Sequence, residues 1–347
     1  MNELFFITDQ DLLTAIKVFM FGIALMLIPF AQLLKSKFNL TVLIMSFHFI
    51  AMTMVYRGVD DIVYGFLFVI PFIILCKRRT VYIDISKFAY YFVLLYFLVL
   101  IFILLMPTAY IGSKYVPATL ASGPHTSVYS ILIYMFAIFL AYKKRHISIL
   151  IWLPILFMTI FFLLEYQVRN AQLGIILFFF TYYFYESRLS NTFRNSAIFL
   201  LILFSSIILF TLFTFINIDL NDFSSGRLLA WAERLNILIN RSFIELFFGT
   251  GYGSDLITTD QWWWKAKNSH NDFIGLLFNG GFLSLGFILW IFYKMFNKAN
   301  SFQKGLIVFI LVTSLTNTGY LGRPIQFLFM VIIIISATSL KTNSRAQ

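Results

Sequence analysis

Charged residues are scarce in this chain: they make up 12% of its 347 residues, whereas hydrophobic residues make up 60%. A soluble domain averages about 25% charged and roughly 45–50% apolar residues, and it needs a polar surface around its core. This imbalance excludes a soluble enzyme, an intrinsically disordered protein and a disulfide scaffold. The single cysteine, Cys76, also excludes an internal disulfide and a cysteine-based metal site. We therefore predict a polytopic integral membrane protein.

Alternation of polar and apolar residues is also missing, which excludes a β-barrel, because barrel strands need that alternation. The apolar runs are continuous instead, as in helices that cross a bilayer with about 20 residues. The sequence predicts an all-α fold with about eleven transmembrane helices, in a single transmembrane domain over residues 1–347. The predicted spans are 14–34, 38–56, 62–76, 87–106, 127–142, 147–164, 171–186, 197–216, 273–293, 305–321 and 325–340.

Acidic residues are few as well, with 15 Asp and Glu against 26 Lys and Arg, which gives a net charge of +11. The basic residues gather in every second loop. Short loops rich in Lys and Arg stay in the cytoplasm, which predicts an external N-terminus and a cytoplasmic C-terminus. The basicity is thus an orientation signal, and we expect no nucleic-acid partner. The clusters lie at 35–37, 77–79, 143–145, 188–194, 294–304 and 341–345.

The largest polar segment, residues 217–272, is predicted to be an external loop, and function tends to concentrate in such departures from minimal hairpins. The serines before Gly226 indicate a helix start. Arg227, Arg234 and Arg241 are seven residues apart, so they share one helical face. An apolar face beside a basic face predicts a helix in the membrane interface. There Arg234 and Arg241 contact either lipid phosphates or a substrate.

Three short motifs follow that helix. Glycines at 249, 251 and 253 end it, either as a tight turn or as a phosphate cradle that lacks the Lys-Ser/Thr of a P-loop. The run Trp262–Trp264 is typical of an interfacial aromatic belt, and Trp263 is a candidate for stacking on a sugar ring. His270 lies directly before a span, where an imidazole can act as a base near neutral pH. Its structural alternative is a packed histidine.

Two further arginines, Arg169 and Arg323, lie at the external ends of predicted spans. Arginine close to hydrocarbon is costly unless it is paired, so each indicates a partner or a ligand. For Arg169 the structural alternative is a salt bridge with Glu165.

The order of these motifs resembles the O-antigen polymerase and ligase superfamily, which are bacterial inner-membrane glycosyltransferases of the GT-C type. The resemblance rests on Ser-Gly-Arg-Leu-Leu-Ala-Trp at 225–231, Gly-Thr-Gly-Tyr-Gly at 249–253, Ser-His-Asn-Asp at 269–272 and Gly280-Gly281. It covers about residues 165–293, and upstream only the hydrophobic topology is similar. The family often has Ser-Arg-Gly where this chain has Val168-Arg169-Asn170.

The resemblance implies glycosyl transfer from undecaprenyl pyrophosphate at the external, periplasmic face, and it is closest to a polymerase of lipid-linked repeat units. It implies a lipid-linked glycan as both donor and acceptor, membrane lipid as surroundings, and a chain-length regulator as protein partner. Arginine suits a departing pyrophosphate, because its planar guanidinium binds two oxygens at once and stays charged. We expect His270, Arg227 and Arg169 to be catalytic. The expected substrate-binding residues are Arg323, Arg234, Arg241, Asn271 and Trp263.

Pyrophosphate is already a good leaving group, so we expect no metal and no other cofactor. Asp60-Asp61 imitates an acidic metal pair but lies in a tight loop with Arg57. Three alternatives stay open: a ligase that transfers the finished glycan to lipid A-core or another acceptor, a lipid-linked-sugar flippase, and a membrane scaffold. A flippase predicts charges spread within the spans around a polar cavity.

Overall fold

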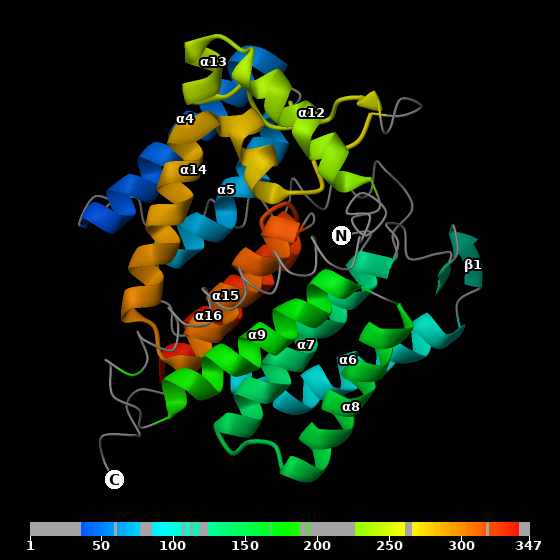
Figure 1. Ribbon diagram of the computed structural model, residues 1–347. Coiled ribbons are helices and arrows are strands. Elements are labelled where there is room, and N and C mark those ends of the chain that lie inside the picture. Colours follow the sequence, from blue (N-terminus) through cyan, green and yellow to red (C-terminus); the bar gives the residue numbers. More distant parts are fainter. Residues whose placement is uncertain are drawn as a thin grey trace.

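The computed structural model describes most of the chain between residues 36 and 339 (Figure 1). Helices dominate it, and their boundaries follow local capping chemistry. The Ser36 hydroxyl accepts a hydrogen bond from the Asn39 amide (3.1 Å) at the start of the first described helix. A capping box between Ser242 and Glu245 begins a short loop helix. The described residues are 36–58, 61–76, 85–105, 108–111, 114–117, 124–166, 168–187, 193, 226–260, 266–316 and 319–339.

The elements of the described chain fall into long apolar helices and shorter loop elements. The long helices are α4 (Lys37–Arg57), α5 (Ile62–Cys76), α6 (Ala89–Leu105), α7 (Pro124–Lys143), α8 (Ile149–Glu165), α9 (Arg169–Glu186), α14 (Asp272–Lys298), α15 (Ser301–Thr316) and α16 (Pro324–Ser336). The shorter elements are the 3₁₀ turns η1 (Ile85–Phe88) and η3 (Ala337–Ser339), strands β1 (Thr108–Ile111) and β2 (Lys114–Pro117), and helices α12 (Arg227–Ile239) and α13 (Phe243–Phe248).

Nine of the eleven predicted spans fall on described helices, so their helical character is confirmed. The predicted spans 14–34 and 197–216 lie outside the described residues. Among those that are described, α4 and α14 are the two helices long and apolar enough to cross a bilayer, and other apolar helices are shorter. The structure thus shows a helical and strongly apolar chain, while an eleven-span topology stays a prediction.

The all-α prediction is confirmed for the described residues, and the first long loop adds one short hairpin to it. Residues 107–126 contain an antiparallel hairpin, in which Thr108 pairs with Pro117 and Ile111 with Lys114. Helix α7 then begins at Pro124. Proline suits the first turn of a helix, because a backbone N–H at that position would have no partner within the helix.

The core of the bundle is aromatic and lies where α7, α9 and α15 meet. Phe136 contacts Phe178 and Phe309, with ring centroids 4.7 and 4.9 Å apart. Two glycines allow this approach: a Cβ at Gly174 would lie 2.8 Å from the Phe309 ring, and one at Gly305 would lie 2.8 Å from Phe178. Small residues let apolar helices pack closely where side-chain burial alone gives little preference.

The long helices define two ends of the molecule, which we call the basic end and the loop end. At the basic end the Lys144 ammonium donates to the Ser336 carbonyl (3.2 Å), and Lys304 lies 3.8 Å from the Tyr185 ring centroid. At the opposite end, α12 and α13 contact α14 (Figure 1). Described members of the predicted cytoplasmic clusters at 143–145 and 294–304 thus share one end, and the large loop occupies the other.

Candidate active site at the loop end

Helix α12 presents its basic face to the protein and part of its apolar face outward. Arg234 is fully buried, while Leu229 and Ile239 are 50% and 74% exposed. Arg227 and Arg234 share a face of α12, but the helix ends at Ile239 with Asn240 as its C-cap, so Arg241 lies beyond it and the predicted shared face holds for two of the three arginines. Arg234 points into the protein and not toward solvent or lipid headgroups. The helix begins at Arg227 after Gly226, whose φ of 78° is left-handed. A glycine, rather than the predicted serine side chain, therefore occupies the N-cap position.

Arg234 holds the loop together from inside. Its guanidinium donates to the carbonyls of Lys267 (2.7 Å) and Asn268 (3.3 Å), which belong to a segment that pairs with Ile257. Burial lowers the pKa of this guanidinium, and the charges of Asp255 and Glu233 oppose that shift. A side chain with no exposed surface cannot reach a substrate or a lipid phosphate, which corrects both predictions made for Arg234.

Asn271 and Arg241 also have partners within the fold. The Asn271 side-chain oxygen caps α14 by accepting from the Phe273 and Ile274 amides (3.0 and 3.2 Å), and its nitrogen donates to the Leu315 carbonyl (2.8 Å). Asn271 is 5% exposed and acts as a helix cap, and its predicted substrate role stays a prediction. Arg241 is half-buried, donates to the Thr250 hydroxyl (3.0 Å) and lies 4.4 Å from the Phe278 ring centroid. A substrate role for Arg241 stays a prediction.

Arg227 differs from Arg234 and Arg241. Its guanidinium is half-buried, and no hydrogen bond or ion pair joins it to any residue that the structure describes. Burial lowers its pKa, and the Tyr129 phenol opposes that shift. A cation removed from water without a counter-charge is unfavourable, so an anion bound at this position would stabilise the arginine.

Tyr129 on α7 is the hub that brings several predicted residues to one place. Its hydroxyl accepts a hydrogen bond from the Asn170 side chain, directly after Arg169, and its carbonyl accepts from the Tyr320 hydroxyl (2.9 Å). The Arg323 guanidinium lies 5.1 Å from the centroid of its ring, and Arg227 is within electrostatic range of its hydroxyl. Arg227, Arg323 and the start of α9 therefore gather around one buried tyrosine.

Arg169 itself is the first residue of α9 and is exposed, beside this hub. Its predicted catalytic role stays a prediction.

Asp272 forms the other side of this cluster, and the sequence assigned it no role. The carboxylate is 7% exposed and accepts hydrogen bonds from the Gly319 amide (3.0 Å), the Ser314 hydroxyl and the Gly322 amide. It thereby ties the first turn of α14 to the α15–α16 loop, which carries Arg323. Its place in the Ser-His-Asn-Asp motif was the signal that could have identified it.

His270 adopts a strained backbone between these elements. Its φ of 50° is left-handed, a conformation that non-glycine residues rarely adopt and that concentrates at functional sites. One residue earlier, the Ser269 carbonyl accepts a hydrogen bond from the Trp231 indole (2.7 Å). Trp231 lies one helical turn after Arg227, so the Arg227 face of α12 packs against the His270 turn.

The glycine motifs form a tight junction that supports this turn, and the tight-turn interpretation of 249–253 is confirmed. Gly249, Gly251 and Gly253 all have left-handed φ values, between 76° and 86°. The Thr250 and Gly251 amides donate to the carbonyls of Phe278 and Asn279, both at 2.9 Å. These bonds place the segment against Gly280-Gly281, where α14 is kinked.

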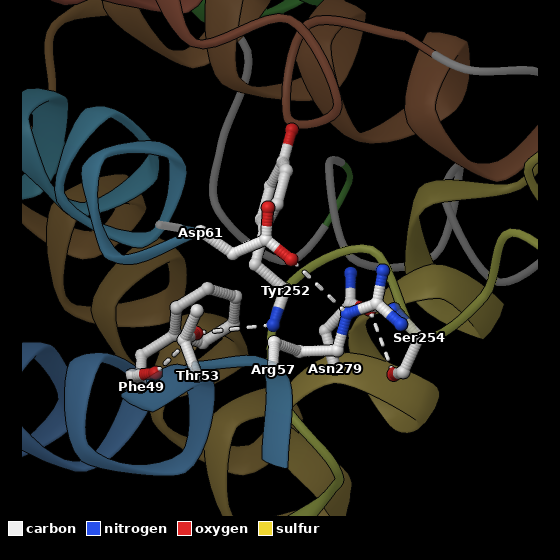
Figure 2. A network of polar contacts seen from close by, with 7 residues as sticks. All are labelled: Phe49, Thr53, Arg57, Asp61, Tyr252, Ser254 and Asn279. Atoms are coloured by element: carbon white, nitrogen blue, oxygen red, sulfur yellow. Dashed lines mark hydrogen bonds and ion pairs between the residues drawn. The ribbon is translucent and has the colours of Figure 1, made fainter. Parts of the chain in front are cut away.

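A cavity of about 180 Å³ lies beneath the His270 turn. Sequence reasoning missed it, because its walls come from α5, α14 and two loops. Figure 2 shows how the segment that forms one wall is anchored: the Tyr252 amide donates to the Thr53 hydroxyl (3.0 Å), and Ser254 binds the Asn279 side chain. The same view shows Arg57 beside them, paired with Asp61 at 3.4 Å. Asp61, one of the two acidic residues considered above as a metal pair, therefore has Arg57 as its ion-pair partner.

Two points complete the comparison with the predicted site. Trp263 lies outside the described residues, and so does Asp60. Among the residues that the structure describes, no group of three or more His, Cys, Asp or Glu side chains could hold a metal ion.

The chain matches no protein-family model, no curated protein and no solved structure.

Proposed function

We propose that the protein is a membrane glycosyltransferase that polymerises undecaprenyl-pyrophosphate-linked repeat units into a surface polysaccharide such as O-antigen. The observation that carries the proposal is Arg227: a half-buried cation without a partner among the described residues, one helical turn before Trp231, which donates to the Ser269 carbonyl next to His270. An anion-binding arginine next to a strained histidine suits a reaction in which pyrophosphate departs as a hydroxyl attacks.

In the proposed reaction, a sugar hydroxyl of the acceptor attacks the anomeric carbon of the donor glycan. The bond between that carbon and the phosphate oxygen breaks, and undecaprenyl pyrophosphate leaves with its electron pair. Arg227 binds the pyrophosphate oxygens, with Arg323 and Arg169 as further cations at the same end. His270 accepts the proton of the acceptor hydroxyl. Charge stabilisation of this kind contributes about 10²–10³ in rate per donor group.

We propose a bacterial inner-membrane location with about eleven spans, a periplasmic N-terminus and loop end, and a cytoplasmic basic end. The exposed apolar side chains of the long helices support this, because a water-soluble surface would not carry so many of them. Phe47, Leu105 and Leu150 are 74%, 77% and 80% exposed. Membrane lipid and a chain-length regulator are the proposed partners, beside the lipid-linked glycan.

The test is complementation of a chromosomal deletion, followed by gel analysis of the cell-surface glycan. We expect the deletion to leave a single repeat unit on the lipid A-core. Arg227→Ala and His270→Ala should fail to restore polymer, with a loss on the order of a hundredfold for Arg227→Ala. Arg227→Lys should also be impaired, because a point charge does not replace a planar fork. Lys294→Ala, at the basic end, is the matched control and should restore normal chains.

Other gel patterns would contradict the proposal in distinct ways. Polymer that remains on its carrier lipid while the core carries no repeat would identify a ligase. The absence of any externally exposed repeat unit would identify a flippase. Normal chain lengths with Arg227→Ala, in a protein that still inserts, would remove the arginine from the mechanism.

A further inference from the structure

The cavity at the loop end opens directly beside the candidate catalytic residues. Two of its lining residues, Ser269 and Asp272, flank His270, and a third, Gly322, precedes Arg323. The cavity of about 180 Å³ is smaller than the roughly 300–1,000 Å³ pockets that hold drug-sized ligands. It therefore suits one small ring rather than a lipid tail or a long oligosaccharide. Its polar lining consists of Asp255, Asn268, Ser269, Asp272 and Asn279.

Two of these polar side chains are more than nine-tenths buried and have unused hydrogen-bonding groups. Asp255 is 7% exposed, and one of its oxygens accepts from the Ser269 amide (3.0 Å); the other has no donor among the described residues. Asn279 is 9% exposed, and its oxygen accepts both the Ser254 amide and hydroxyl (3.1 Å each). Its amide nitrogen has no acceptor in the described chain. Both residues line the cavity, so these two atoms are available there to water or to a ligand.

An aromatic wall and a missing side chain complete the shape of the cavity. Tyr252 stacks on Tyr64 with an interplanar angle of 6° and also contacts Phe68, so the position of its ring is fixed. On α14, Gly275 lies on the same helical stripe as Asp272 and Asn279. A Cβ at Gly275 would lie 3.2 Å from both an Asp255 oxygen and the Ser269 hydroxyl. Glycine thus keeps the space beside Asp255 open.

The charged side chains that line the cavity itself are acidic, while Arg234 and Arg323 are the cations within electrostatic range of them from outside the lining. The lining carries the carboxylates of Asp255 and Asp272, and its described part contains no lysine or arginine. The Asp272 carboxylate is committed to the hydrogen bonds with Ser314, Gly319 and Gly322, which leaves Asp255 to face a ligand. A ligand carboxylate placed beside Asp255 would be repelled by its charge.

We propose that this cavity is the subsite for one uncharged, hydroxyl-rich sugar ring, recognised by Asp255 and Asn279, and that it rejects sugars that carry a carboxylate. Asp255 accepts a hydroxyl proton, the Asn279 nitrogen donates to a ring or hydroxyl oxygen, and the Tyr252 and Phe68 rings cover the apolar face of the sugar. The inference rests on the proposed function in taking a glycan as the substrate. It adds which sugars the site accepts.

The test is direct binding to the purified full-length protein in lipid nanodiscs, measured by saturation-transfer NMR. The probes are methyl β-glucoside and methyl β-galactoside, each compared with its uronoside, which differs only in the carboxylate at C6. We expect at least one neutral glycoside to bind, at least about tenfold more tightly than its uronoside. Equal binding within both pairs, or no binding by any probe, would overturn the proposal.

Two variants and a control identify the residues. Asp255→Asn keeps an oxygen for the Ser269 amide but removes the charge, so the preference for the neutral glycoside should fall several-fold. Asn279→Asp replaces the donor with a third carboxylate and should weaken neutral binding about tenfold or more. Asp260→Asn changes an exposed carboxylate of the same loop and should have no effect. Unchanged selectivity in the first two variants, with the fold intact by thermal unfolding, would contradict the assignment.

The binding assay separates this inference from the proposed function. Arg227→Ala should retain glycoside binding while polymer formation is lost. Normal polymer with Arg227→Ala, together with weakened binding in Asn279→Asp, would overturn the polymerase mechanism and leave the sugar subsite standing. Loss of polymer with Arg227→Ala, together with no glycoside binding by the unmodified protein, would overturn the subsite alone.

Discussion

Three arginines spaced seven residues apart, two on α12 and the third just beyond its end, have three different surroundings. Arg234 is enclosed by backbone carbonyls, and Arg241 is shared between the Thr250 hydroxyl and the Phe278 ring. Arg227 has no partner in the described chain. Arginine can support structure or bind an anion with the same fork of donors. The difference lies in whether acceptor atoms of the protein already bind the N–H donors of the guanidinium.

Replacing Arg234 tests the structural role at the scale of one residue. Arg234→Ala removes donors from the Lys267 and Asn268 carbonyls and leaves a cavity, so we expect the free energy of unfolding to fall by about 3–5 kcal/mol. Thermal unfolding in detergent, without any substrate, measures the loss. Arg227→Ala is the comparison and should unfold close to the unmodified protein, since no hydrogen bond or ion pair with a described residue is lost. Equal unfolding temperatures for Arg234→Ala and the unmodified protein would refute the structural role.

The residues of the cavity show where reasoning from the sequence stops. Asp255 and Asn279 are 24 positions apart, with ordinary neighbours, and no spacing rule joins them. Their proximity depends on the turn at 249–253 folding back on α14, through contacts between main chains. Residues inside recognisable motifs, such as His270 and Arg227, could be singled out from the sequence, because type and context there carry chemical information.

At the scale of elements, the apolar runs predicted helices well, but they could not predict the direction in which α12 faces. A helical period shows which residues share a face. It does not show whether an apolar face turns toward protein or lipid, because in a membrane protein both surroundings are apolar. Burial of Arg234 and exposure of Ile239 settle the direction for α12. The outward apolar residues remain compatible with the predicted place in the membrane interface.

The junction between the two glycine motifs is the element-scale feature with the sharpest steric requirement. Gly281 has a φ of 64°, and a Cβ there would lie 2.2 Å from the Phe247 carbonyl oxygen. Gly281→Ala should therefore lower the free energy of unfolding by at least about 2 kcal/mol. Gly286→Ala, in the same helix, is the control, because its Cβ meets no atom within 4 Å. It should leave stability unchanged or raise it by up to about 1 kcal/mol.

Thermal unfolding of both variants shows whether the kink of α14 requires a glycine at position 281. Similar unfolding temperatures for Gly281→Ala and Gly286→Ala would show that the kink tolerates a side chain and that the glycine pair has no steric role. Loss of stability in Gly281→Ala alone would explain why this chain carries both glycine motifs: one supplies the turn, and the other leaves room for it.

At the scale of the whole molecule, the basic loops and the candidate catalytic residues lie at opposite ends of the described helices. The basic end is held by contacts among the ends of α7, α9, α15 and α16, including the bond between the Asn300 amide and the Ala337 carbonyl (2.7 Å). The loop end gathers Tyr129, Asp272 and Arg323. The sequence could predict this separation because short basic loops alternate along the chain.

This separation predicts which residues a membrane-impermeant thiol reagent can reach. In a Cys76→Ser background, Asp260→Cys should be labelled in cells whose outer membrane alone is permeabilised, because it is exposed at the loop end. Arg145→Cys, exposed at the basic end, should be labelled only after lysis. Labelling of both cysteines in unlysed cells, or of Arg145→Cys alone, would invert or abolish the proposed orientation. The Arg227 and His270 site would then face the wrong compartment for an externally presented lipid-linked glycan.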